Sequence, residues 1–149
     1  MLRFLMMLAL LVAVVFVAPA QVWTAGVSGS FDSSRRAVGY ANVAYYPDPV
    51  LSLYALGGAG GGQKEARVGM SMAVAEYSRC YLRLFGETGA AYGFKRVGFS
   101  GAVGLSPQFF LRETSTVPIS LEPFVRAKYQ LGRGVIEAGF GIQFILRRR

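Results

Sequence analysis

The sequence alternates, residue by residue, between large apolar side chains and small or polar ones in short segments from Val22 to Leu146. In the clearest segment, Val68, Met70, Met72 and Val74 fall on one face of a strand, with only Gly, Ser and Ala on the other. A soluble sheet usually carries Lys, Glu and Thr on its outward face. An almost side-chain-free face instead indicates the crowded interior of a narrow barrel whose apolar face meets lipid.

Eight segments with this rhythm predict strands, at about residues 23–31, 37–46, 50–59, 68–75, 82–87, 97–106, 119–129 and 136–144. The expected fold is an all-β, eight-stranded, antiparallel, up-and-down transmembrane β-barrel. Residues 57–67 are expected to form a glycine-rich loop that carries Lys64, Glu65 and Arg67. Pro123 is out of place inside the seventh strand because proline cannot donate to a ladder, and Phe109 to Leu111 could extend the sixth.

The first twenty residues have the pattern of a cleaved export signal. Arg3 precedes an unbroken apolar run over residues 4–17, and Ala18-Pro19-Ala20 provides small residues for cleavage between Ala20 and Gln21. The run is short for a membrane-spanning helix, although an uncleaved anchor helix is the alternative. The expected organisation is a signal peptide at 1–20 and one outer-membrane barrel domain at 21–149.

The chain carries a net charge of +8 and contains no histidine. Export and the lack of a contiguous basic helix argue against nucleic acid as the partner, and favour anionic lipid headgroups or surface polysaccharide. Cys80, the single cysteine, is expected to pack as a small apolar residue. No phosphate-binding glycine fingerprint appears, so no cofactor and no metal are expected.

The export signal, the eight alternating segments and the final aromatic Phe144 together resemble the small eight-stranded outer-membrane barrels of Gram-negative bacteria, of the OmpA-domain and OmpX-like kind. The resemblance covers the whole chain after the signal. It implies location in the outer membrane, outer-membrane lipids as surroundings and the outer-membrane assembly machinery as a partner. Members of this family usually end near the last aromatic residue, whereas this chain continues to Arg149, and its outer connections are short.

Six charged residues are predicted to face the barrel interior from the fifth, seventh and eighth strands: Arg83, Glu87, Glu122, Arg126, Lys128 and Glu137. Their three positive and three negative charges balance, as expected of a buried salt-bridge network. The alternatives are a paired-carboxylate site or a polar conduit. Without histidine, a serine or cysteine nucleophile lacks its usual base, so no enzymatic activity is expected.

The predicted outer loops are strongly basic. They set seven basic residues against Asp32 and Glu65, a net charge of +5, and the seven are Arg35, Arg36, Lys64, Arg67, Lys95, Arg96 and Arg133. Such a ring suits the phosphates of lipopolysaccharide, although scattered solvated charge is the simpler interpretation.

The sequence therefore favours a non-enzymatic integral outer-membrane barrel with a structural or surface-interaction role. It leaves two alternatives open, a histidine-independent lipid-modifying enzyme of the envelope and a soluble periplasmic β-barrel or sandwich with its apolar face inward. The surface role is expected to involve lipopolysaccharide or a partner protein at the basic outer loops, and the identity of a protein partner is left open.

Overall fold

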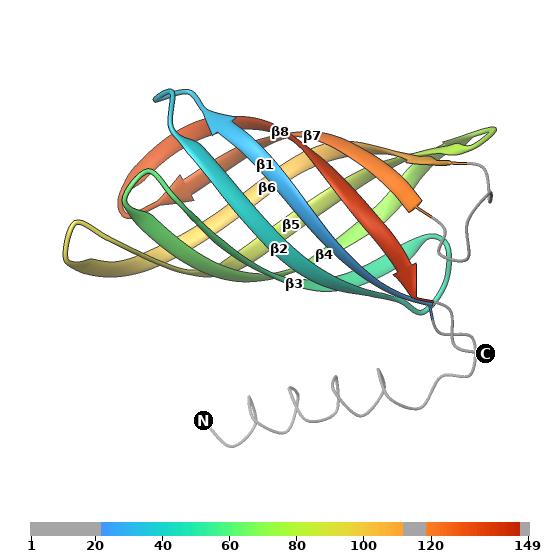
Figure 1. The fold of residues 1–149 in the computed structure, drawn as a ribbon, viewed down its shortest axis with the longest axis horizontal. Helices are drawn as coiled ribbons and strands as arrows, with labels where there is room; N and C mark the ends of the chain where they lie inside the picture. Colours follow the sequence, from blue (N-terminus) through green and yellow to red (C-terminus); the bar gives the residue numbers. More distant parts are fainter. Residues whose placement is uncertain (1–21, 112–118, 147–149) are drawn as a thin grey trace, which may run out of the picture.

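The chain is a closed barrel of eight antiparallel strands joined in sequence order (Figure 1). The computed structural model describes residues 22–111 and 119–146. The strands are β1 (Val22–Asp32), β2 (Ala37–Tyr46), β3 (Leu51–Gly60), β4 (Gln63–Tyr77), β5 (Cys80–Gly93), β6 (Arg96–Phe110), β7 (Ile119–Gln130) and β8 (Arg133–Leu146). Strand β1 pairs with both β2 and β8, which closes the sheet and confirms the predicted fold class.

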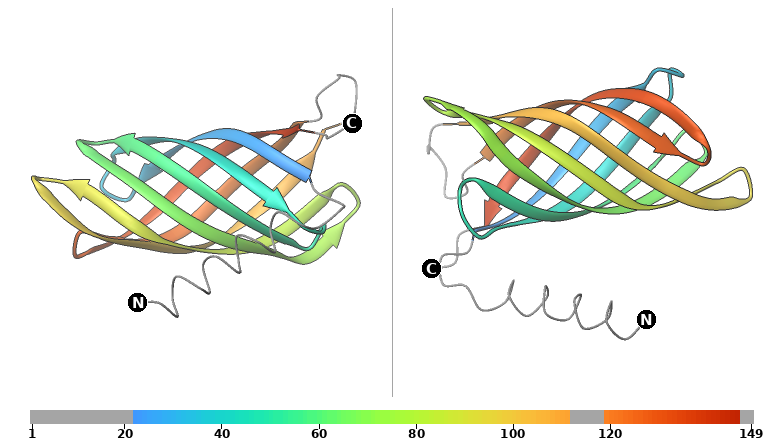
Figure 2. Two further views of the ribbon diagram at one scale, coloured as in Figure 1. Left: turned by 90° about the horizontal axis from the view of Figure 1, so that it is seen from below. Right: turned by 180° about the vertical axis from the view of Figure 1, so that it is seen from behind.

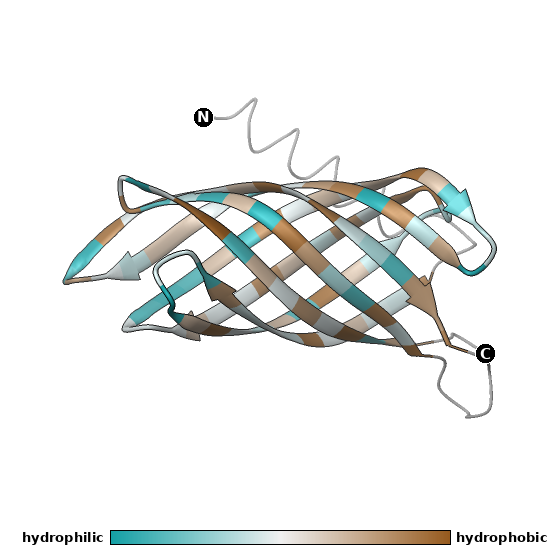
Figure 3. Ribbon diagram, turned by 90° about the horizontal axis from the view of Figure 1, so that it is seen from above, coloured by the Kyte–Doolittle hydropathy of each residue, from teal (hydrophilic) through white to brown (hydrophobic). Residues whose placement is uncertain are grey.

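The alternation decides which side chains face outward. Val68, Met70 and Met72 are 59%, 55% and 49% exposed, whereas Ser71 between them is buried. Brown and pale bands accordingly alternate along the strands in Figure 3. Phe140 is exposed as predicted and Ile142 is half-buried. Because the apolar face points outward, the alternative of a soluble barrel with an apolar interior is wrong.

The two ends of the barrel differ in their connections. At one end, here called the hairpin end, short turns join β1 to β2, β3 to β4, β5 to β6 and β7 to β8 (Figure 2). Three of these turns place both central residues at positive φ, the conformation that matches the twist of paired strands. The residue pairs are Gly61 with Gly62, Phe94 with Lys95, and Leu131 with Gly132. The other end, here called the terminal end, holds the start of β1, the end of β8 and the β2–β3 and β4–β5 connections.

The predicted glycine-rich loop at 57–67 is wrong. Strand β3 continues to Gly60, β4 begins at Gln63, and only Gly61 and Gly62 form the turn. Inward Gly58 stays in the ladder because the interior needs the space that it leaves: a side chain there would put its Cβ 2.3 Å from the Tyr40 ring. Lys64, Glu65 and Arg67 are therefore strand residues.

Prolines interrupt one ladder inside the barrel wall. The β6–β7 pairing runs to Leu105 with Val125 and resumes at Phe109 with Leu121, a register that sets Pro107 opposite Pro123. Neither proline can donate to the other strand, and the Ser106 hydroxyl instead donates to the Pro123 carbonyl over 3.0 Å. Strand β6 reaches Phe110, as the predicted extension required.

Some sequence predictions fall outside the described residues. These are the signal peptide with its cleavage site at Ala20 and Gln21, and the basic tail at 147–149. In the described part of the chain no helix is long and apolar enough to cross a membrane, a finding that carries no information about strands.

Candidate functional site

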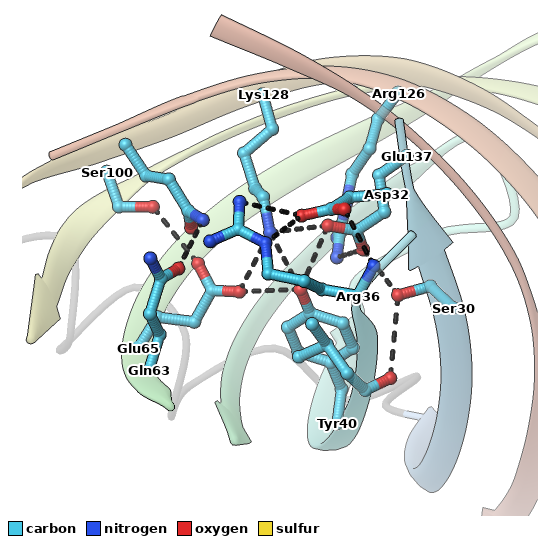
Figure 4. Close-up of polar contacts among 12 residues, drawn as sticks. Ser30, Asp32, Arg36, Tyr40, Gln63, Glu65, Ser100, Arg126, Lys128 and Glu137 are labelled. Atoms are coloured by element: carbon cyan, nitrogen blue, oxygen red, sulfur yellow. Dashed lines mark hydrogen bonds and ion pairs between the residues drawn. The ribbon is translucent and has the colours of Figure 1, made fainter. Parts of the chain in front are cut away.

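Six buried charges form a closed ring inside the hairpin half of the barrel. Figure 4 shows four of them, Glu65, Arg126, Lys128 and Glu137, around Tyr40. The ring, in order of contact, is Arg67, Glu87, Arg126, Glu137, Lys128 and Glu65. Each cation touches two carboxylates and each carboxylate touches two cations, so the charges alternate and balance to zero. Such local pairing is what makes buried charge tolerable.

Arginine and lysine side chains make the links of this ring. Arg67 lies 3.2 Å from Glu87 and 3.6 Å from Glu65, as ion-pair contacts without aligned hydrogen bonds. The Arg126 guanidinium reaches Glu87 at 3.2 Å and also contacts Glu137. These side chains are at most 4% exposed, so water screens the pairs little.

Lys128 closes the ring around a central tyrosine. Its ammonium lies 3.2 Å from Glu65 and contacts Glu137. The Tyr40 hydroxyl lies among them, donating to Glu65 over 2.5 Å and accepting from Lys128 over 3.1 Å. Arg126 stacks over the Tyr40 ring, 4.6 Å from its centroid. The tyrosine thereby fills the middle of the barrel at this level.

Every strand contributes to this cross-section. Beyond the charged residues, Ser30 of β1 donates to Glu137, Tyr54 of β3 donates to Glu87, and Ser100 of β6 donates to Glu65. The ring with its hydroxyl donors therefore ties all eight strands together at one height.

The terminal half of the interior is built differently. Arg83 contacts no carboxylate in the described part of the chain. It donates to the Ser71 hydroxyl over 2.8 Å and to the carbonyls of Pro49 and Val50 over 3.1 and 3.0 Å. It therefore anchors the β2–β3 connection to β5.

Glu122 lies among neutral donors. Gln108 donates to it over 2.5 Å, Gln143 over 3.3 Å and Ser120 over 3.4 Å. Between Glu122 and Arg83 lies an interior cavity of about 80 Å³, which Asn42 also lines. It extends to Glu87 and Arg126 of the ring, whereas the other four ring members do not line it. That volume holds a few water molecules, since one water needs roughly 10–15 Å³ of free space.

The predicted interior network is thus divided between two places. The structure brings Glu87, Arg126, Lys128 and Glu137 together, but Arg83 and Glu122 lie elsewhere. Glu65 and Arg67 complete the ring instead. The alternation itself was the signal for these two residues: Glu65 and Arg67 lie an even number of residues before inward Ser71, so a continuous strand would point them inward. The prediction of a loop over these residues prevented that inference.

The hairpin end carries a basic rim, defined here as the five exposed residues Arg35, Lys64, Lys95, Arg96 and Arg133. Two predicted members do not belong to it. Arg67 is 2% exposed and lies in the ring, so its assignment to a phosphate-binding loop is wrong. Arg36 pairs with buried Asp32 at 2.9 Å, and its side chain is 22% exposed.

No exposed carboxylate accompanies the basic rim in the described ranges. Glu65 and Asp32, the acidic residues predicted to offset it, are both buried. At the terminal end, by contrast, the carboxylates of Asp48 and Glu76 are exposed, as is Arg79. Across residues 22–111 and 119–146, no group of three His, Cys, Asp or Glu side chains is arranged to hold a metal ion.

Comparison with known proteins finds similar solved structures but no matching family model or curated protein. No protein-family model and no curated protein matched this sequence. Among solved structures, a de novo designed transmembrane β-barrel is similar with a TM-score of 0.57 at 13% identity, covering 84% of this chain and 95% of that one.

A natural barrel is similar to the same degree. The N-terminal β-barrel domain of Pseudomonas aeruginosa OprF gives a TM-score of 0.53 at 13% identity, covering 84% of this chain and 97% of that one. The de novo designed TMB2.3 gives 0.52 at 12% identity, covering 89% and 99%. At these identities the likeness establishes the fold, and the chain has the fold of the small eight-stranded transmembrane β-barrels that its sequence resembles.

Proposed function

We propose that this chain is a non-enzymatic integral β-barrel of the outer membrane that binds lipopolysaccharide phosphates through its basic rim. The observation that carries the proposal is the basic rim itself, five exposed cations at one end with no exposed carboxylate among the described residues there. Guanidinium groups bind phosphate through paired hydrogen bonds, and ammonium groups bind it as compact point charges.

Two features support placement in the outer membrane. The apolar outward face suits lipid, and a closed sheet satisfies its backbone hydrogen bonds without water. The export signal predicted at 1–20 supplies a route to the envelope, where the barrel-assembly machinery is the expected partner. With the terminal end in the periplasm, the basic rim faces outward, where lipopolysaccharide resides.

The interior supports a structural role over catalysis. A histidine-independent lipid-modifying enzyme needs a carboxylate that a substrate can reach. Glu65, Glu87 and Glu137 are each held by two cations, and Glu122 is enclosed by three side-chain donors. The cavity of about 80 Å³ beside Glu122 is too small for a lipid chain and headgroup.

The test neutralises the basic rim. Purified barrel with Arg35, Lys64, Lys95, Arg96 and Arg133 all changed to Gln is compared with the unmodified protein for binding to purified lipopolysaccharide. We expect the unmodified protein to bind more weakly as salt rises, because the Debye length shrinks from about 10 Å at 0.1 M to about 3 Å at 1 M. We expect the variant to lose most of its binding, and divalent cations to compete for the same phosphates.

The matched control is Arg79→Gln, which removes an exposed cation from the terminal end. It is expected to bind as the unmodified protein does. Binding that ignores both salt and the five substitutions, with the fold intact, contradicts the proposal and leaves a purely structural role.

A further inference from the structure

The outward face of the barrel is unevenly covered. Small residues gather on β1 to β4 towards the hairpin end, and they are Gly29, Ala37, Gly39, Ala41, Ala55, Gly57, Ala59 and Ala66. They are neighbours across strands, since Gly39 pairs with Gly29 and Ala59, while Gly57 pairs with Ala41 and Ala66. At the same level β6 to β8 present bulky side chains such as Phe99, Tyr129 and Ile136.

The barrel's own packing does not require the outward glycines. A Cβ at inward Gly69 would lie 2.8 Å from the Tyr54 ring, and one at inward Gly139 would lie 2.6 Å from the Phe124 ring. A Cβ at outward Gly39 or Gly57 would meet only a carbonyl oxygen at 4.0 or 3.9 Å, an ordinary contact. Glycine weakens a strand interior, and it is often found at a bulge, at a bend, or where a ligand or another backbone approaches closely.

Four of the small outward residues, Ala41, Ala55, Gly57 and Ala66, line a groove in the outer wall. Its volume is about 440 Å³, and the outward side chains that line it are Ala41, Val43, Ala55, Ala66, Val68 and Thr88, with Gly57 at its floor. Small outward residues on β2, β3 and β4 leave room for this depression.

Two polar groups single out this groove. Of the strand residues described, Lys64 is the only charged one on the outward face, and Thr88 is the only outward serine or threonine. Thr88 lines the groove opposite Val68. Lys64 follows Ala66 towards the hairpin end, between its strand partners Ala59 and Tyr92 and next to the Gly61–Gly62 turn. A cation there lies at headgroup level, above an apolar groove.

We propose that the groove on β2 to β5 holds an acyl chain of lipopolysaccharide while Lys64 binds a phosphate of the same molecule. This inference rests on the proposed function and adds to it where the lipid part of the ligand lies. Charge complementarity argues for an anionic lipid. A second copy packed here about a twofold axis would bring its own Lys64 towards this one, and like charges repel across such an interface.

A second outer groove, of about 650 Å³, provides the comparison. It lies over β6 to β8 and includes Gly134, Tyr129 and Ile136. The rim cations on these strands are Arg96 and Arg133. Each lies an even number of residues from an inward residue of its strand, Ser100 or Glu137, so neither points outward above this groove. Gly134 is also open, with nothing within 4 Å of an added Cβ, which makes it a matched control position.

The experiment measures two probes on the purified, detergent-solubilised barrel by native mass spectrometry. One probe is lipid A, the acylated and phosphorylated anchor of lipopolysaccharide, and the other is the same bisphosphorylated disaccharide without acyl chains. The variants are Ala41→Val with Gly57→Val, which fill the groove at two paired lining positions, the control Gly134→Val, and Lys64→Gln. Circular dichroism verifies that each variant keeps the β-barrel.

We expect the double valine variant to bind lipid A roughly tenfold more weakly, since burial of chain methylenes drives such binding. It should bind the deacylated disaccharide unchanged. Gly134→Val should match the unmodified protein with both probes, and Lys64→Gln should weaken both.

Several outcomes overturn the inference. Equal lipid A affinity in the double valine variant and the unmodified protein removes the groove site, and the proposed function stands if the disaccharide still binds. Equal losses in the double valine variant and in Gly134→Val show unspecific lipid contact. A dimer that the double valine variant dissociates makes a second copy the occupant. An unmodified protein that binds neither probe contradicts the proposed function as well.

Discussion

The two halves of the barrel interior solve the burial of charge in different ways. In the hairpin half, each of six charges touches two of opposite sign, and Tyr40 fills the centre. In the terminal half, Arg83 and Glu122 are satisfied by hydroxyls, amides and carbonyls, and a cavity of about 80 Å³ separates them. The first half depends on mutual pairing, the second on local dipoles and room for water.

This difference predicts which half of the barrel loses more stability when a charged side chain is removed. In a dense ring, removal of one member leaves its neighbours with charge that nothing else compensates. Beside a cavity, water can take the place of a lost partner. The same kind of substitution is therefore expected to cost far more in the hairpin half than in the terminal half.

The largest effect is expected from Glu137→Leu. This carboxylate contacts Arg126 and Lys128 and accepts from Ser30, so its loss leaves two buried cations undercompensated. We expect a loss of about 3–5 kcal/mol in the free energy of unfolding. Urea unfolding in lipid vesicles, followed by the fluorescence of the single tryptophan, measures it. A cost below that of Arg83→Met would reverse the comparison.

Arg83→Met is expected to cost less, about 2 kcal/mol, because hydrogen bonds to a charged donor are lost beside a cavity that admits water. The effect should be local. Arg83 holds the carbonyls of Pro49 and Val50, so protease cleavage at the β2–β3 connection should speed up. Cleavage at the β4–β5 turn is the control and should not change.

The next prediction concerns substitution of two oppositely charged members of the ring together. Changing Glu65 and Arg67 together to Leu leaves Lys128 paired with Glu137 and Glu87 paired with Arg126, so the four remaining charges stay balanced. We expect the double variant to be more stable than either single variant, with a coupling of about 0.5–3 kcal/mol. Additive losses in the double-mutant cycle would show that the six charges do not act as a ring.

The smallest effect is expected from Glu122→Gln. The amide keeps the shape of the carboxylate and an oxygen to accept from Gln108, and Glu122 contacts no cation in the described part of the chain. The free energy of unfolding should change by less than about 1 kcal/mol. Glu137→Gln in parallel should cost several times more, and equal costs would erase the distinction between the halves.

The sequence predicts the architecture well because one physical constraint repeats along it. Strict alternation at Val68 to Val74 assigns each side chain to lipid or interior, and the short turns close the barrel in sequence order. The same rhythm also assigns Arg126, Lys128 and Glu137 to the interior. Odd or even position along each strand was sufficient for these predictions.

Odd or even position along a strand does not give the height of a side chain along the barrel axis. That height depends on the register between tilted strands. Arg83 and Glu87 share a face of β5, yet Glu87 pairs across the ladder with Ala102 near the ring, while Arg83 pairs with Ser106 towards the terminal end. The alternation of inward and outward residues could therefore not predict which inward charges form the ring. Glu65 and Arg67 were missed for a simpler reason: a run of glycines usually breaks a strand, and here Tyr40 needs the space that Gly58 leaves.

The central claim is that the alternating face meets lipid while its opposite face fills the interior. Single cysteines at Met72 and at Ser71, in a chain with Cys80→Ala, test it on adjacent residues of β4. A fluorophore attached at each site is read in vesicles whose acyl chains carry a quencher. The account predicts strong quenching at position 72 and little at position 71. Stronger quenching at position 71, or none at either position, would contradict it.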